Sequence, residues 1–331
     1  MERDQEKMQF LGFFGVFKES YMIMFSWRKI FSLITLTLIL PLSLIFLINM
    51  EVSQVMFGGI LFYSERISRT KFGTPHQKRL INTISIEWAS FIIFKLIYFV
   101  FFLIFSLVST SAVVHTIASI YTSREVTLKK AMGAVAKVWK RLVITFLCTF
   151  AAFFIYNVVA GIVLFIWALT IGENIYGMAT LLVIGILYIV GFIYLAAVWQ
   201  LANVVSMLED SSGIKAMMKS NELIKGKKGL SLIITFMLSV FFFLIQFLFS
   251  MVLLRLFHVG LVWKIASGVL CLLLLCHLLL LMLVIQTVLY FVCKSYHHEI
   301  IGKSALSEQL EVYQGEHELV KATGVQQDSH V

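Results

Sequence analysis

Residues 139–171 read WKRLVITFLCTFAAFFIYNVVAGIVLFIWALTI, and this stretch decides the fold. After Lys140 and Arg141, the 30 residues 142–171 contain no charged side chain. A helix that crosses a bilayer needs about 20 apolar residues, and the hydrocarbon interior offers no water to unpaired backbone groups. The stretch therefore predicts a transmembrane helix that is opened by a basic pair.

Five further apolar runs have the same character, at 30–49, 96–121, 175–207, 230–254 and 265–293. The chain is 60% hydrophobic and 14% charged, with a mean hydropathy of +0.93, which excludes a single water-soluble core. All 18 Asp and Glu lie outside the runs, which also lack the alternating polarity of barrel strands. These features predict an all-α polytopic membrane protein with six transmembrane helices.

Three amphipathic segments precede basic pairs at the start of the first, third and fifth runs, and this pattern predicts three interfacial helices. The pairs are Arg28-Lys29, Lys140-Arg141 and Lys227-Lys228. The apolar faces comprise Phe10, Phe13, Phe14, Phe17, Tyr21, Met24 and Phe25; then Leu128, Met132, Val135, Val138, Trp139 and Leu142; then Ile214, Met217, Met218 and Ile224, with Ser211 or Ser212 as the expected cap. The alternative is that these segments are polar connectors packed on the bundle.

The distribution of Lys and Arg predicts the orientation. With both termini in the cytoplasm, 19 basic residues face inward and seven face outward, although five of those seven lie in the expected loop 50–87. The interfacial helices then lie on the cytoplasmic face. This arrangement suggests three pseudo-repeats, each made of one interfacial helix followed by two spans. We expect an amphipathic segment at 1–29, a membrane domain at 30–293 and a polar tail at 294–331. The sequence favours neither the endoplasmic reticulum nor the plasma membrane.

Two segments, VTLKKAMGAVAKVWKRLVITF (126–146) and MLEDSSGIKAMMKSNELIKGKKGLSLIITFML (207–238), resemble a bacterial membrane domain. It is the domain found beside some bacterial glycerophosphodiester phosphodiesterases. The whole chain, including FKESYMIMFSWRKIFSLITLTLILPLS (17–43), is similar to a group of uncharacterised plant six-span proteins. The bacterial catalytic barrel with its metal-binding carboxylates has no counterpart in this sequence, so the resemblance implies architecture and no phosphodiesterase activity.

Two sets of residues are candidates for function. Basic side chains beside the spans are expected to bind anionic lipid headgroups: Arg28, Lys29, Lys130, Lys137, Lys140, Arg141, Lys215, Lys219, Lys225, Lys227 and Lys228. Polar side chains inside the spans can mark a solute path or serve helix packing: His115, Asn157, Gln200, Asn203, Gln246, His277 and Gln286. For His115, local contacts with Ser111 and Ser119 are the stronger expectation.

These patterns leave three functional hypotheses. The preferred one is a non-enzymatic membrane protein that organises or senses the bilayer, or scaffolds partners, through its basic helices. The alternative is a carrier or channel for a neutral or amphiphilic solute. An intramembrane enzyme is disfavoured because the spans contain no carboxylate, and we find no catalytic, metal-binding or cofactor motif. The net charge of +9 is explained by the membrane-flanking clusters, so no nucleic-acid partner is expected.

Overall fold

The computed structural model describes residues 8–70, 73–122, 128–170, 175–255 and 261–297. In these ranges the chain is helical, with short turns and no strand. Among the residues that the structure describes, six stretches are long and apolar enough to cross a membrane: Arg28–Arg69, Pro75–Tyr121, Val138–Thr170, Gly177–Leu208, Lys228–Met251 and Ile265–Tyr296. The prediction of an all-α, multi-pass membrane protein with six spans is therefore confirmed.

The helices follow one another with short connections. Their bounds are α2 (Phe13–Ser26), α3 (Arg28–Ile34), the π-helix η1 (Thr35–Ile39), α4 (Leu40–Arg69), α5 (Pro75–Tyr121), α6 (Leu128–Thr170), α7 (Ile175–Leu208), α8 (Ile214–Ile224), α9 (Lys228–Arg255) and α10 (Leu261–Tyr296). Pro41 lies in the first turn of α4 and has no backbone N–H, which accounts for the wider π turn just before it.

The chain divides into two compact units. Unit 1 comprises Met1–Ile34, Thr110–Phe242 and Leu280–Val331, and unit 2 comprises Thr35–Ser109 and Phe243–Leu279. Long helices pass from one unit to the other, so unit 1 holds α2, α3, α6, α7 and α8 together with one end of α5, α9 and α10. All three predicted amphipathic segments belong to unit 1.

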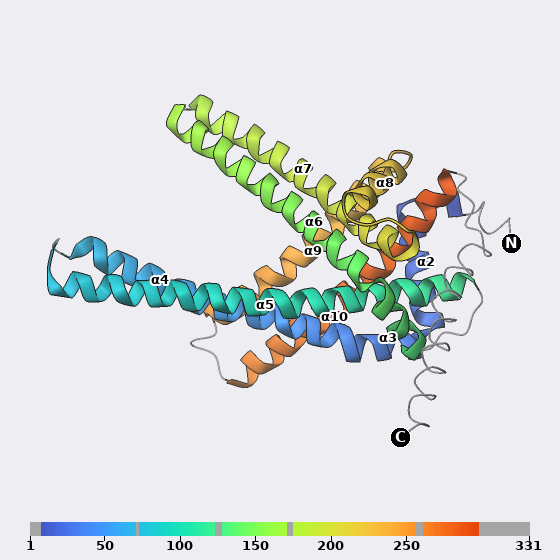
Figure 1. Ribbon diagram of the computed structural model, residues 1–331, viewed down its shortest axis with the longest axis horizontal. Helices are drawn as coiled ribbons and strands as arrows, with labels where there is room; N and C mark the ends of the chain where they lie inside the picture. Colours follow the sequence, from blue (N-terminus) through green and yellow to red (C-terminus); the bar gives the residue numbers. More distant parts are fainter. Residues whose placement is uncertain (1–7, 71–72, 123–127, 171–174, 256–260, 298–331) are drawn as a thin grey trace, which may run out of the picture. The chain divides into compact units, whose positions relative to one another are not determined.

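In unit 1, α6 and α7 form an antiparallel hairpin, with α8 beside its lower end (Figure 1). Aromatic rings join the two long helices: the ring of Phe153 lies 5.3 Å from that of Phe192 and 5.2 Å from that of Trp199. The hydroxyl of Tyr156 donates a hydrogen bond of 2.8 Å to the carbonyl of Tyr188. Most of the remaining hairpin surface is apolar and exposed, as expected for a surface that faces lipid.

In unit 2, the prediction of a loop at residues 50–87 is wrong, because most of these residues continue α4 and α5 as helix. Polar residues support these extensions, as in the 2.5 Å ion pair between Arg69 and Glu65 one helical turn apart. Between the two helices, Lys95 Nζ donates to Asn49 Oδ1 at 2.9 Å and to Ser53 Oγ at 2.6 Å. The hydrophobic runs therefore mark the membrane-embedded part of each helix and underestimate helix length.

The predicted interfacial segments differ in form. The first and third correspond to separate helices, α2 and α8, which end just before their basic pairs. The second is no separate helix, because α6 runs unbroken through Lys140 and Arg141. The cap of α8 is Gly213, without a side-chain hydrogen bond, so the prediction of a serine cap is wrong. Residues 1–7 and the predicted tail from residue 298 onward lie outside the described residues.

Candidate membrane-interface site

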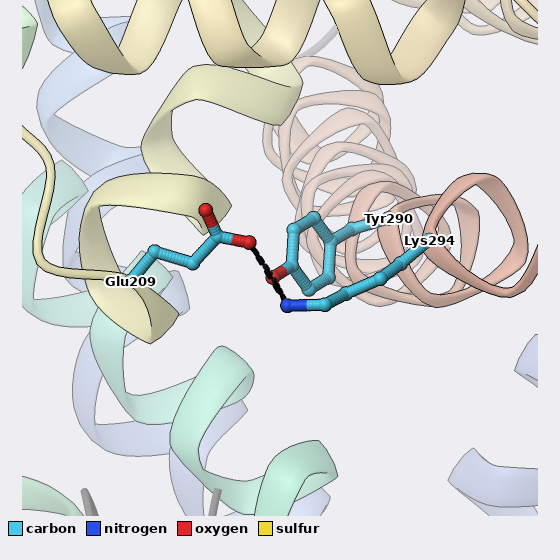
Figure 2. Close-up of polar contacts among 3 residues, drawn as sticks. All are labelled: Glu209, Tyr290 and Lys294. Atoms are coloured by element: carbon cyan, nitrogen blue, oxygen red, sulfur yellow. Dashed lines mark hydrogen bonds and ion pairs between the residues drawn. The ribbon is translucent and has the colours of Figure 1, made fainter. Parts of the chain in front are cut away.

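The turn that joins α7 to α8, residues 209–213, is held by side chains from two other helices. Glu209 Oε1 accepts hydrogen bonds from the Tyr290 hydroxyl at 2.7 Å and from Lys294 Nζ at 3.0 Å. Lys294 Nζ also donates to the Tyr290 hydroxyl at 3.1 Å. Figure 2 shows the carboxylate of Glu209 pointing toward both partners on α10. These contacts fix the end of α7 to the end of α10.

This ion pair is largely removed from solvent. The side chains of Glu209 and Lys294 are 19% and 18% exposed, and Tyr290 is buried. A charged pair that has lost most of its water remains favourable only when both partners and their hydrogen bonds are present. The cluster therefore acts as a structural clamp at the end of the bundle.

A second set of contacts ties the same turn to α6. Arg141 binds Asp210 at 2.5 Å, and Thr145, one helical turn further along, accepts a 2.8 Å hydrogen bond from the backbone N–H of Gly213. The Thr145 hydroxyl also lies 2.7 Å from the Ser206 hydroxyl. Because Arg141 and Thr145 are four residues apart, both face the turn. The predicted headgroup ligand Arg141 thus has a carboxylate partner on the same chain, although the Asp210 side chain is largely exposed.

Helix α8 packs on α6 and α7 through one face, which buries Ala216, Ser220, Leu223 and Ile224. The Ser220 hydroxyl donates a 2.8 Å hydrogen bond to the carbonyl of Val198 on α7. This contact fixes α8 to α7 at the residue before Trp199.

The far end of α8 rests against the end of α10. His297 Nε2 donates a 3.1 Å hydrogen bond to the carbonyl of Leu223, because a carbonyl can only accept. The Lys227 ammonium lies 5.4 Å from the centroid of the Tyr296 ring, within the range of a cation–π interaction. A Cβ at Gly226 would clash with the Tyr296 ring, so any larger residue there would force this ring to move.

Helix α2 buries a narrow face formed by Val16, Ser20 and Ile23. The predicted aromatic stripe is largely left uncovered: Phe14 is 84% exposed and Phe25 is 73% exposed. Phe10, just before the helix, is also exposed, whereas the remaining members, Phe13, Phe17, Tyr21 and Met24, are half-buried. The exposed rings lie in the same unit as α8.

Partial burial raises the pKa of Glu19 on α2, because desolvation penalises its carboxylate. The folded-state pKa then lies above the unfolded one, so the unfavourable contribution is fully present at neutral pH and is relieved as the pH falls through the folded-state pKa. We expect Glu19→Gln to raise the apparent Tm at neutral pH by about 1–3 °C, because it removes the desolvated carboxylate. The increase is small because the side chain is half-exposed. Thermal unfolding in nanodiscs at neutral and mildly acidic pH checks this. An equal gain at both pH values would contradict the assignment.

The candidate headgroup ligands differ in exposure. Arg28, Lys29, Lys140, Lys215, Lys225 and Lys228 are exposed, whereas Arg141, Lys219 and Lys227 are half-buried. Lys130 and Lys137 belong to α6, but their side chains lie outside the described part of the chain. The exposed members lie on or beside α3, α6, α8 and α9, all at elements of unit 1.

The seven polar side chains inside the spans come from five helices and from both units. His115 is buried, with its Nδ1 3.5 Å from the Ser119 hydroxyl, and Asn157 accepts a 2.9 Å hydrogen bond from the Tyr188 hydroxyl. Gln286 is buried and His277 is exposed, while Gln200, Asn203 and Gln246 are half-buried. Among the described residues, no three His, Cys, Asp or Glu side chains gather as metal ligands would.

The Glu209–Lys294 clamp could not be located from the sequence. Its partners are 85 residues apart, and each is an ordinary charge just beyond or at the end of a span. The opposite charges at the ends of two spans are the one signal that the sequence offered. Lys95 is visible in the sequence as a charge at the start of the second apolar run, but its contacts with Asn49 and Ser53 require the antiparallel register of α4 and α5.

Comparison with known proteins gives one result. No curated protein and no solved structure matches the chain. The model of the family described as Domain of unknown function (DUF8558) matches residues 1–330, and the chain therefore belongs to this family.

Proposed function

We propose that this chain is a non-enzymatic membrane protein that binds anionic lipid headgroups on the cytoplasmic face, and that it thereby organises or senses the bilayer or scaffolds partners there. In this proposal both termini are cytoplasmic, and nucleic acid is not a partner. The binding elements are α2 with the basic pair at the start of α3, the first turns of α6, and α8 with the basic pair that follows it. They correspond to the three amphipathic segments, and they support a reading of the fold as three pseudo-repeats that resemble the membrane domain of the bacterial phosphodiesterases and the plant six-span proteins.

The observation that carries the proposal is the way α8 is mounted. One face is fixed to the spans by the hydrogen bond from Ser220 to Val198, while Lys215 and Lys225 are exposed, and Ile214 and Met218 are exposed at the edge of α8 beside the spans. Exposed apolar side chains favour shallow insertion, and each lysine near an anionic surface gains about 1 kcal/mol. The contacts of Glu209, Asp210 and Gly213 hold this arrangement in place.

The charge-reversal variant Lys215→Glu/Lys225→Glu tests the proposal. We expect the wild-type protein to unfold at a higher apparent Tm in nanodiscs of phosphatidylcholine with phosphatidylserine than in phosphatidylcholine alone, because a ligand of the native state stabilises it. The variant should lose about 2 kcal/mol of this lipid-dependent stabilisation. Thermal unfolding in the two nanodisc types measures the difference.

The matched control is Lys78→Glu/Arg79→Glu, two exposed basic residues near the start of α5. Both lie well outside the apolar part of α5, which begins after Lys95. The distance along the helix from Lys95 is about 25 Å, since each helical residue rises 1.5 Å. The control should keep the response to phosphatidylserine. If wild type shows no such response, or if both variants lose it equally, the proposed function is wrong.

The carrier or channel alternative is favoured by two buried polar atoms. Asn203 Oδ1 on α7 and Gln286 Nε2 on α10 have no hydrogen-bond partner among the residues that the structure describes. Unpaired polar atoms inside spans can line a solute path. Solute flux into liposomes that contain only this protein would support the alternative and would count against the proposal above.

A further inference from the structure

A pocket of about 500 Å³ lies between α6, α7 and α8. Its α6 wall is made by Cys148, Ala151 and Ala152, three small side chains at the spacing of one helical face. Met217 and Met218 of α8 line the opposite side. The space thus exists because small residues on the span face α8 across a gap, and methionine side chains adapt readily to a variable occupant.

The pocket is almost entirely apolar. Its two polar residues, Tyr194 and Asn221, are hydrogen-bonded to each other, because the Tyr194 hydroxyl donates to Asn221 Oδ1. The remaining lining side chains are aliphatic or contain sulfur. Its volume falls within the roughly 300–1,000 Å³ of small-molecule sites, and its chemistry selects an apolar ligand.

The surroundings identify which apolar ligand this is. Two of the three walls belong to helices that are long and apolar enough to cross a membrane, so lipid acyl chains are the apolar ligands expected beside the pocket. Lys215 is exposed and follows Ile214, which lines the pocket, and it lies three residues before Met218. Helix α8 with its cap Lys225 carries three lysines against one carboxylate, Glu222. A negatively charged headgroup complements this edge.

We infer that the pocket between α6, α7 and α8 holds one acyl chain of an anionic glycerophospholipid, with the phosphate of its headgroup at Lys215. This inference rests on the proposed function and names its ligand. Binding both parts of one molecule would give α8 selectivity for headgroup charge and would retain the lipid longer than simple contact with the bilayer surface.

Native mass spectrometry of the detergent-purified full-length protein tests the inference, with added dioleoyl phosphatidylserine or dioleoyl phosphatidylcholine. Wild type should retain one phosphatidylserine in preference to phosphatidylcholine. Ala151→Phe fills the pocket and should lower retention of both lipids about tenfold. Lys215→Gln should abolish the preference for phosphatidylserine and leave retention of phosphatidylcholine unchanged.

Val159→Phe is the matched control, because Val159 lies on the same helix, is 53% exposed and does not line the pocket. It should bind lipid as wild type does. Met218→Gln at the exposed rim is a second pocket variant that keeps the test decisive if Ala151→Phe does not fold, and it should lower retention of both lipids.

The outcomes separate the two proposals. If the pocket variants bind as wild type while Lys215→Gln loses the phosphatidylserine preference, the pocket inference is overturned and the proposed function stands. If the pocket variants lose lipid but wild type prefers neither lipid, the headgroup assignment and the proposed function are both overturned. Equal loss in Val159→Phe would mean that bulk on α6 is responsible, which would also overturn the pocket.

Discussion

Replacing Glu209 by glutamine is expected to lower the free energy of unfolding by about 2–4 kcal/mol, because it leaves the Lys294 ammonium largely buried without a counter-charge. The two side chains are 19% and 18% exposed, so water only partly compensates for the lost carboxylate. In nanodiscs this corresponds to a fall in apparent Tm of about 5–10 °C. Thermal unfolding followed by circular dichroism measures it.

The double variant Glu209→Gln/Lys294→Met gives the sharper result. Removing both charges also removes the unpaired cation, so the double variant should be more stable than Glu209→Gln alone. Arg69→Gln is the control, because Arg69 pairs with Glu65 at 2.5 Å but the two side chains are 78% and 60% exposed. That change should cost less than about 1 kcal/mol. Equal losses in the buried and exposed pairs would show that Glu209 and Lys294 do not form a clamp.

The spans could be predicted from the sequence because hydrophobicity acts locally. A run such as 142–171 must be helical wherever it lies in the bilayer, since no other conformation satisfies its backbone. Helix length was harder to predict, because α4 and α5 continue into residues that are polar enough to suggest a loop. Internal hydrogen bonds allow a helix to extend past its apolar part, and the hydrophobic pattern contains no signal for its end.

The candidate site could be predicted only in part. The exposed lysines follow from their position beside the spans, and Lys215 and Lys225 are indeed at the surface. Which basic residue is internally paired depends on tertiary contacts, as with Arg141 and Asp210 across 69 residues of sequence. The pocket is likewise a property of three helices together, because the small side chains of α6 create space only where α8 crosses them.

Gly213 holds the turn that positions α8, and its substitution should have the second large effect. Its φ is 60° with ψ at −130°, a conformation that residues with a Cβ rarely adopt. An added Cβ would also lie 3.2 Å from Cys148 Sγ and 3.2 Å from a methyl group of Ile144. Any relief by movement would weaken the hydrogen bond from the Gly213 N–H to Thr145. We expect Gly213→Ala to cost about 2–4 kcal/mol.

The expected response is local before it is global, because α8 can detach while α6 and α7 remain paired. Hydrogen exchange of residues 214–224 should therefore accelerate in Gly213→Ala at temperatures where the spans stay protected. The control is Gly229→Ala near the start of α9, where an added Cβ meets nothing within 4 Å and alanine is the better helix former. If α8 stays protected in Gly213→Ala, the turn does not position the helix. If α8 is released but phosphatidylserine still stabilises the protein, headgroup binding does not depend on α8, and the basic residues of α3 and α6 become the principal ligands.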